Sequence, residues 1–253
     1  MLKKILICIL FIIAISKLSL AYQAESLFNK GNEYYLKNDF EKAVDTYEKL
    51  IKSGYEGTSL YYNLGNAYYR QGKLGYAILN YEKALKLSPG DEDIQHNLAL
   101  ANAKTIDKIE DLPKFFIFQW WESLLALFSV SGWTITAYIF YFLMLTSIGL
   151  YFFSKTQLRQ RYSIFSTLIS LILLLIVTTL LIVKANRELN IKNGIVVEQS
   201  VNVKLSPGEH GGDAFIVHEG IKVKLEDEID NWVKIKLQDG KIGWMPESDV
   251  KAI

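Results

Sequence analysis

The chain has 253 residues, is 50% hydrophobic and carries a formal net charge of +1. That length allows two small domains plus membrane segments, and the charge gives no indication of a general nucleic-acid binder. Residues 194–253 hold 11 acidic residues against 7 lysines, so charge alone should not draw them to phosphates or anionic lipid. The single cysteine, Cys8, lies in an N-terminal apolar run, which excludes disulfides and cysteine chemistry from the rest of the chain.

Residues 1–21 have the pattern of a secretory signal peptide. A pair of lysines precedes an apolar run over residues 5–15, and small side chains at Ser19 and Ala21 come before an expected cleavage at Tyr22. The alternative is an uncleaved anchor. In either case the residues that follow are expected to be exported.

Residues 24–57 and 58–91 share ten identical residues when they are compared at a shift of 34 positions. Their period is that of the tetratricopeptide (TPR) repeat, in which each unit is a pair of antiparallel helices. The ten identical pairs are Asn29/Asn63, Gly31/Gly65, Asn32/Asn66, Tyr34/Tyr68, Tyr35/Tyr69, Ala43/Ala77, Tyr47/Tyr81, Glu48/Glu82, Lys49/Lys83 and Lys52/Lys86. We therefore predict a TPR domain over residues 22–112.

The repeated pattern has a packing reason. Two helices approach closely only where side chains are small, and tyrosines fill the adjoining space; a proline stops the last helix. The residues expected to do this are Gly31, Tyr34, Ala43, Tyr47, Gly65, Tyr68, Ala77, Tyr81 and Pro89.

A third helical stretch over residues 92–111 resembles the first helix of another repeat, but no matching second helix follows it. We therefore interpret it as a capping helix. Two repeats plus a cap form a solenoid that is close to the smallest size that is stable alone. The domain is therefore expected to be stabilised by contact with a partner or with the membrane.

Exposed positions on the first helix of each repeat predict a groove for an extended peptide. Asparagine side chains can bind a peptide backbone, and aromatic rings supply stacking area. The candidate groove residues are Phe28, Asn32, Tyr35, Tyr62, Asn66 and Tyr69. The alternative is that these aromatic residues only pack against neighbouring helices.

Two uncharged stretches predict a transmembrane hairpin, at residues 134–153 and 163–183. Each is about 30 Å long as a helix, which matches a bilayer core. The connecting residues 154–162 carry three basic residues, so the positive-inside rule places this loop in the cytoplasm. Both soluble domains are then expected on the opposite side. Neither span contains an ionisable residue, which argues against a transporter.

The segments that flank the hairpin differ in character. Residues 113–133 are strongly apolar and contain Trp120 and Trp121, so we interpret them as an interfacial helix with tryptophans at headgroup depth. The alternative is a helix packed under the TPR domain. Residues 184–193 are expected to be a linker.

Residues 194–253 alternate short apolar strands with Gly, Asp and Asn turns, which predicts a small β barrel. The runs VNVKLSP, HEGIKVKL, NWVKIKL and DGKIGWMPESDV resemble the strands of bacterial SH3 domains. Trp232 and Trp244 are candidates for an aromatic ligand groove in such a barrel. The alternative is that both are core residues.

The sequence offers no catalytic or metal-binding motif. His210 and His218 have no companion at metal-ligand spacing, and no nucleophile–base pair or phosphate-binding loop is present. We therefore expect no catalytic residue, metal or cofactor, and a protein that is not an enzyme.

Taken in order, these parts resemble the BatE-type members of the Bacteroides aerotolerance (Bat) family. The similarity covers nearly the whole chain, and in the C-terminal part it is carried largely by Phe215, Val217, His218, Glu219, Gly220 and Trp232. The resemblance implies a Gram-negative inner membrane, a gene cluster that encodes von Willebrand A-domain proteins and a MoxR-type ATPase, and a link to oxidative-stress tolerance. It also implies the von Willebrand A-domain proteins as partners. It implies no catalytic residues.

The sequence thus predicts a multi-domain protein with all-α TPR hairpins, a two-helix transmembrane hairpin and a small all-β SH3-like barrel. The expected function is a membrane-anchored scaffold whose periplasmic modules bind membrane and periplasmic proteins. The alternative is cell-wall binding, with peptidoglycan as the ligand of the SH3-like domain, or envelope-stress sensing through that domain.

Overall fold

The computed structural model describes residues 23–109, 115–190 and 192–253, so the predicted signal peptide lies outside the described residues. The chain forms two compact units. One combines the N-terminal helices with the C-terminal strands, and the other is built from the helices between residues 115 and 190.

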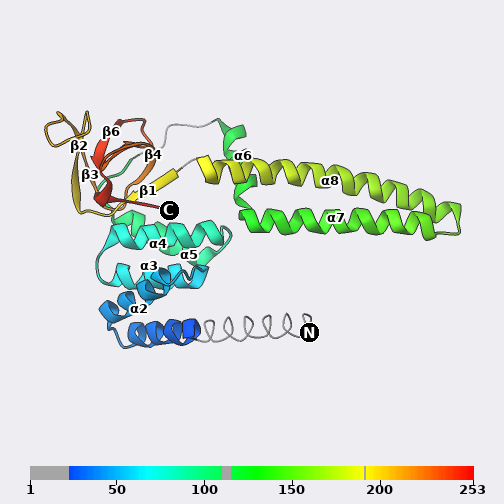
Figure 1. Ribbon diagram of the computed structural model, residues 1–253, viewed down its shortest axis with the longest axis horizontal. Coiled ribbons are helices and arrows are strands. Elements are labelled where there is room, and N and C mark those ends of the chain that lie inside the picture. The colour runs from blue at the N-terminus through cyan, green and yellow to red at the C-terminus, as the bar shows by residue number, and fades with distance from the viewer. Residues whose placement is uncertain (1–22, 110–114, 191) are drawn as a thin grey trace, which may run out of the picture. The chain divides into compact units, whose positions relative to one another are not determined.

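The first unit begins with consecutive antiparallel helices (Figure 1). The residues from 23 to 36 are helical. The helices that follow are α2 (Phe40–Lys52), α3 (Thr58–Arg70), α4 (Leu74–Leu87) and α5 (Glu92–Lys104). α4 ends just before Pro89, where a helix must stop because proline has no N–H to donate.

Both turns within the repeats use the same backbone geometry. Gly72 has a φ of 78°, and Asn38, which occupies the equivalent position in the first repeat, has a φ of 60°. Asparagine is among the few residues besides glycine that visit this left-handed region readily. The backbone N–H of Asp39 donates to the carbonyl of Tyr34, and that of Lys73 donates to Tyr68, so the two turns are equivalent.

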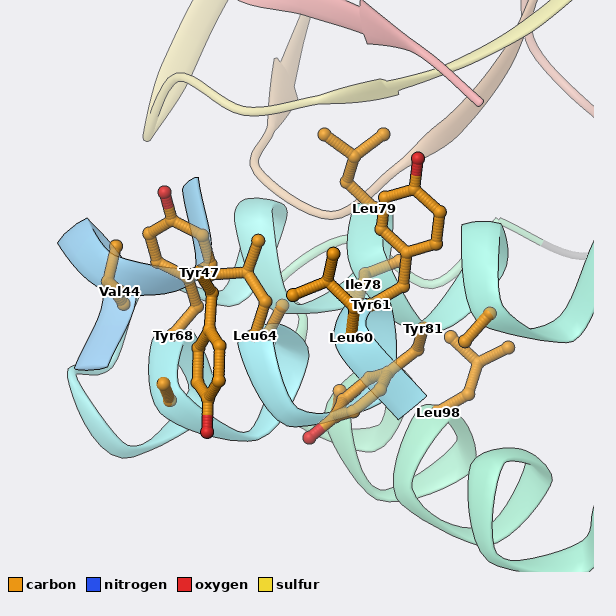
Figure 2. Close-up of a cluster of buried hydrophobic side chains, with 14 of the residues drawn as sticks. Val44, Tyr47, Leu60, Tyr61, Leu64, Tyr68, Ile78, Leu79, Tyr81 and Leu98 are labelled. Carbon is orange, nitrogen blue, oxygen red and sulfur yellow. The ribbon is translucent and has the colours of Figure 1, made fainter. Parts of the chain in front are cut away.

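The helices of each repeat meet at a glycine and a tyrosine. A Cβ atom on Gly31 would collide with the Tyr47 ring, and one on Gly65 would lie 2.7 Å from the Tyr81 ring. Tyr47 and Tyr81 are almost fully buried, and their hydroxyl groups point to the same side of the repeats (Figure 2). The close approach leaves no room for any side chain larger than that of glycine.

The expected packing tyrosines Tyr34 and Tyr68 have different surroundings. Tyr68 is buried, stacks on Tyr76 and donates its hydroxyl proton to Glu48 of the first repeat. Tyr34 is half-buried, and the ammonium groups of two lysines lie over its ring. The difference follows from position, because Tyr68 has a preceding repeat to pack against and Tyr34 does not.

The C-terminal residues form one antiparallel sheet of seven strands in the order β3-β2-β6-β5-β4-β1-β7. The strands are β1 (Lys192–Val196), β2 (Ser200–Lys204), β3 (Asp213–His218), β4 (Lys222–Ile229), β5 (Trp232–Lys236), β6 (Ile242–Pro246) and β7 (Val250–Ala252). Within the described residues β3 and β7 remain at opposite edges of this order, so the ladder is unclosed. The sequence pattern did not indicate β7.

β1 joins the sheet to the repeats. Residues 194–197, which include its last three residues, are all buried. Val196 belongs to the core of the sheet, whereas Ile195 and Val197 pack into the core of the repeats. The two predicted domains therefore share a compact unit, and β1 is covered on both faces.

The predicted capping helix is shorter than expected. The sequence predicts a helix over residues 92–111, but α5 ends at Lys104. Asp107 then accepts a hydrogen bond from the backbone N–H of His218 (2.7 Å) and contacts the His218 ring (2.9 Å), while Ile109 packs on the core of the sheet. These bonds hold residues 105–109 against the sheet instead of letting the helix continue.

The second unit contains two helices that are long and apolar enough to cross a membrane, α7 (Val130–Phe153) and α8 (Gln157–Asn190). They are longer than the predicted spans. The expected loop at 154–162 shrinks to residues 154–156, and the expected linker at 184–193 is helical up to Asn190. Polar residues can extend a helix beyond an apolar core, because helix geometry does not depend on the membrane boundary.

α6 (Phe116–Ala126) packs on this helical pair through its C-terminal half, where Leu125 is buried beside Trp133 and Leu180. Trp121 joins that contact, whereas Trp120 stays exposed. Phe115, Phe116, Ile117 and Phe118 are also exposed.

Candidate interaction groove

A hydrogen-bonded cluster links the first repeat to the second. The hydroxyl of Tyr47 donates to Asn32 Oδ1 (2.7 Å), and Asn63 Nδ2 donates to the same oxygen (2.9 Å). Asn32 and Asn63 lie on the first helices of successive repeats, and Tyr47 lies on the second helix of the first. One carbonyl oxygen thus ties three helices together.

The second repeat contains the same cluster. The hydroxyl of Tyr81 donates to Asn66 Oδ1 (2.8 Å), and Asn97 Nδ2 donates to the same oxygen (3.0 Å). Asn97 also donates to the hydroxyl of Tyr62 (2.9 Å). The residue equivalent to Tyr62 in the first repeat is Phe28, which has no hydroxyl to accept such a bond.

Sequence reasoning missed the roles of Asn63 and Asn97. They occupy equivalent positions one repeat apart, and each follows its acceptor by 31 residues. That spacing was a usable signal. The predicted role of Asn32 and Asn66 changes accordingly, because their side-chain oxygens are occupied within the protein. Their amide groups, for which the described residues provide no acceptor, remain as donors.

A hollow of about 200 Å³ lies beside the first cluster. The residues that line it are Asn32, Tyr35, Leu36, Tyr47, Asn63 and Asn66. Three predicted groove residues, Asn32, Tyr35 and Asn66, are therefore together at this hollow. Leu36, which the sequence analysis did not select, is 80% exposed at its edge.

The other three predicted groove residues pack against neighbours. Phe28 lies 6.0 Å from the Tyr47 ring between ring centres, and Tyr62 lies 6.1 Å from Tyr81. Lys104 Nζ lies 4.3 Å from the centre of the Tyr69 ring. All three side chains are half-buried.

The tyrosines of the two clusters, Tyr47 and Tyr81, are neutral hydrogen-bond donors. Burial raises the pKa of Tyr47 to about 12 and also raises the pKa of Tyr81. Removing the proton would leave a charged oxygen with little water around it, which is costly. At neutral pH the hydroxyl protons therefore remain on both tyrosines and hold the two asparagine carbonyls.

The two candidate tryptophans of the sheet lie on one face. Trp232 pairs with Pro246 and Trp244 pairs with Lys234 across β5 and β6, on the side opposite the buried Val233 and Met245. Trp244 is only 9% exposed, whereas Trp232 is half-buried. Of the two rings, Trp232 has the more surface to offer a ligand.

Within the described ranges, no three His, Cys, Asp or Glu side chains gather as metal ligands would. The groove instead offers amide donors, tyrosine rings and one exposed leucine. Such a surface can bind a polypeptide backbone and an apolar side chain.

A family model described as TPR repeat matches residues 31–72 and 65–105 of the chain. No curated protein matches the chain. The two matched segments overlap at residues 65–72, within the second repeat, and together include the asparagines and tyrosines of both clusters. The prediction of TPR repeats is thereby confirmed, and residues 31–105 are a tandem of TPR repeats, a class of protein–protein interaction module.

Proposed function

We propose that the protein is a membrane-anchored scaffold whose TPR groove binds an extended segment of a partner protein. The main support for this proposal is the hollow beside Asn32. The side-chain amides of Asn32 and Asn66, one repeat apart, can donate hydrogen bonds there, and Leu36 exposes an apolar side chain at its edge. An extended peptide supplies carbonyl acceptors at intervals along its backbone. It would satisfy those donors while covering the leucine.

The anchor in this proposal is the pair α7 and α8, crossing the membrane as a hairpin with its basic tip in the cytoplasm. The TPR repeats and the sheet then lie on the periplasmic side of the inner membrane. The resemblance to BatE-type proteins supports an aerotolerance complex, with von Willebrand A-domain proteins as partners. The likeness of the strand pattern to bacterial SH3 domains supports an SH3-like interaction module.

Site-specific photocrosslinking of the full chain in native membranes tests the groove. A photoreactive residue at position 36 is expected to capture a defined set of membrane or periplasmic proteins, and one at position 87 is expected not to. Leu87 is the control because it is also exposed (42%) but does not line the hollow. Leu36→Asp should reduce capture from the neighbouring position 35 about tenfold, since it places a charge where an apolar group binds.

If photoreactive residues at positions 36 and 87 captured the same proteins, the proposal that the groove binds the partner would be contradicted. We avoid replacing Asn32 or Asn66 in this test because both hold helices together, so a loss of binding could reflect a loss of folding.

Cell-wall binding through the SH3-like module is the second candidate, and the partial exposure of Trp232 favours it. An exposed aromatic ring can stack on a sugar face. The full chain in detergent should then co-sediment with purified peptidoglycan sacculi, and Trp232→Ala should abolish this. Absence of co-sedimentation would remove the idea.

A further inference from the structure

A second hollow, of about 360 Å³, lies where α7 and α8 meet at the turn of the hairpin. The residues around it are Ser147, Leu150, Phe153, Ser154, Arg159, Tyr162, Ser163 and Ser166. Ser147 and Ser166 share a hydrogen bond across the two helices (2.8 Å between oxygens). The hollow thus combines serines and one arginine with apolar walls.

One polar atom in this hollow lacks a partner. The hydroxyl oxygen of Ser154 is buried and has no hydrogen-bond partner in the described part of the chain. A buried unpaired hydroxyl destabilises a structure, so its retention suggests a ligand that completes it. The turn around it is fixed, because Gln160 Nε2 donates to the backbone carbonyl of Ser154 (3.2 Å).

The positive charge at the turn also has no acidic residue near it along either helix. Lys155, Arg159 and Arg161 cluster here, and residues 123–187 contain neither Asp nor Glu. At the other end of the pair, by contrast, Arg187 binds both carboxylate oxygens of Glu122 (2.6 and 2.7 Å). The helix dipoles of α7 and α8 end at the turn with opposite sign and largely cancel, so side chains supply the charge.

We infer that this hollow binds the phosphate headgroup of an anionic phospholipid, with Arg159 as the charged donor and Ser154 as the hydroxyl donor. The inference rests on the proposed membrane hairpin. The uncharged run of α7 ends at Phe153, so the hollow lies at headgroup depth once the helix spans a bilayer. Arginine matches phosphate geometry with paired donors, and Leu150 and Phe153 offer apolar surface to the start of the acyl chains.

Native mass spectrometry of the full chain, released from an uncharged detergent, tests the site with phosphatidylglycerol and phosphatidylcholine as probes. We expect saturable retention of phosphatidylglycerol in preference to phosphatidylcholine. Arg159→Gln should weaken that retention about tenfold, because it removes a charged hydrogen bond. Arg161→Gln is the matched control: it removes the same charge from the same turn, outside the lining of the hollow.

Ser154→Ala separates a ligand contact from a structural role. It should weaken phosphatidylglycerol retention a few-fold while leaving lipid-free thermal stability unchanged or higher, because it removes a buried unpaired hydroxyl. A fall in lipid-free stability would show that the hydroxyl is structural and overturn its assignment as a ligand.

Three results would overturn the inference: equal loss in Arg159→Gln and Arg161→Gln, no preference for phosphatidylglycerol, or displacement of the lipid by equimolar inorganic phosphate. The first indicates diffuse attraction, and the last indicates a site for free phosphate. Carbonate extraction of the same variants from membranes reports insertion independently. A chain that resists extraction but shows no lipid preference retains the proposed anchor and loses only the lipid site.

Discussion

The two TPR repeats contain the same internal cluster but have different neighbours. In both, one asparagine oxygen accepts two hydrogen bonds. One comes from the hydroxyl of a tyrosine on the second helix of the same repeat, and the other from the amide of an asparagine on the helix that comes next in the chain. The hollow lies beside the first cluster. In the second, Tyr62 gives Asn97 an additional acceptor. Identical residues thus reproduce the hydrogen bonds, while the residues that surround the two clusters differ.

Glu48 and Glu82 occupy equivalent positions in the two repeats but have different partners. Glu48 of the first repeat accepts a hydrogen bond from Tyr68, within the solenoid. Its equivalent, Glu82, pairs with Lys222 of β4 (2.7 Å). The backbone N–H of Gly75 also donates to Glu219 (2.8 Å), so the second repeat is fastened to the sheet. The sheet therefore supplies to Glu82 a partner of the kind that the second repeat supplies to Glu48.

The largest expected effect comes from removing the buried tyrosines. Tyr81→Ala should lower the free energy of unfolding by about 3–5 kcal/mol, and Tyr47→Ala should lie near the lower end of that range. The site of Tyr47 borders the hollow, so water can reach the group left unpaired. Urea unfolding of the full chain in detergent measures both. A larger loss for Tyr47→Ala would contradict the assigned difference between the repeats.

The next effect concerns the contact between the second repeat and the sheet. Gly220 has a φ of 91°, and a Cβ atom there would lie 2.7 Å from Ile78 Cδ1 and 2.7 Å from Thr105 Cγ2. Gly240 has nearly the same φ, 93°, with nothing within 4 Å. We expect Gly240→Ala to cost about 1 kcal/mol from backbone strain and Gly220→Ala about 2–4 kcal/mol, because it adds overpacking.

Limited proteolysis of the same two variants shows where the damage lies. Gly220→Ala should expose residues 105–109 to cleavage, since they pack against the sheet, and Gly240→Ala should not. Equal protection of that segment in both variants would mean that the sheet does not stabilise the end of the repeats.

The paired glutamates are expected to respond less strongly and unequally. Glu82→Gln should cost about 1 kcal/mol at low salt, because it removes a partly buried ion pair, and the loss should shrink as salt is added. Glu48→Gln should cost about 0.5 kcal/mol, since an amide oxygen can still accept the Tyr68 hydroxyl. Thermal unfolding of both variants at two salt concentrations checks the contrast.

The smallest effect appears only at high pH. The pKa of Tyr47 is raised in the folded state to about 12, above its ordinary value near 10. Its contribution to stability is therefore fully present below pH 10 and is lost as the pH rises through 12. Tyr47→Phe should flatten that part of the stability profile. Spectroscopic titration of the wild-type chain alongside this variant measures it, and an unchanged profile would refute the assignment.

The sequence was sufficient where the pattern is local. The repeat period predicted the helical hairpins, and two uncharged runs predicted the two long apolar helices, because helix formation and apolar length are read from neighbouring positions. Three predicted groove residues do line the hollow. Phe28, Tyr62 and Tyr69 do not line it, because their rings pack against Tyr47, Tyr81 and Lys104, as the alternative interpretation of these aromatic residues had it.

Only the tertiary structure decided which contacts those patterns make. The pairing of Glu82 with Lys222 joins residues 140 positions apart, and β1 is buried on both faces because it packs on the core of the repeats as well as on that of the sheet. Residues 105–109 leave the helix for the same reason, since the partner of Asp107 is on a distant strand. Local propensity fixes elements, but hydrogen bonds and burial between distant segments fix what those elements touch.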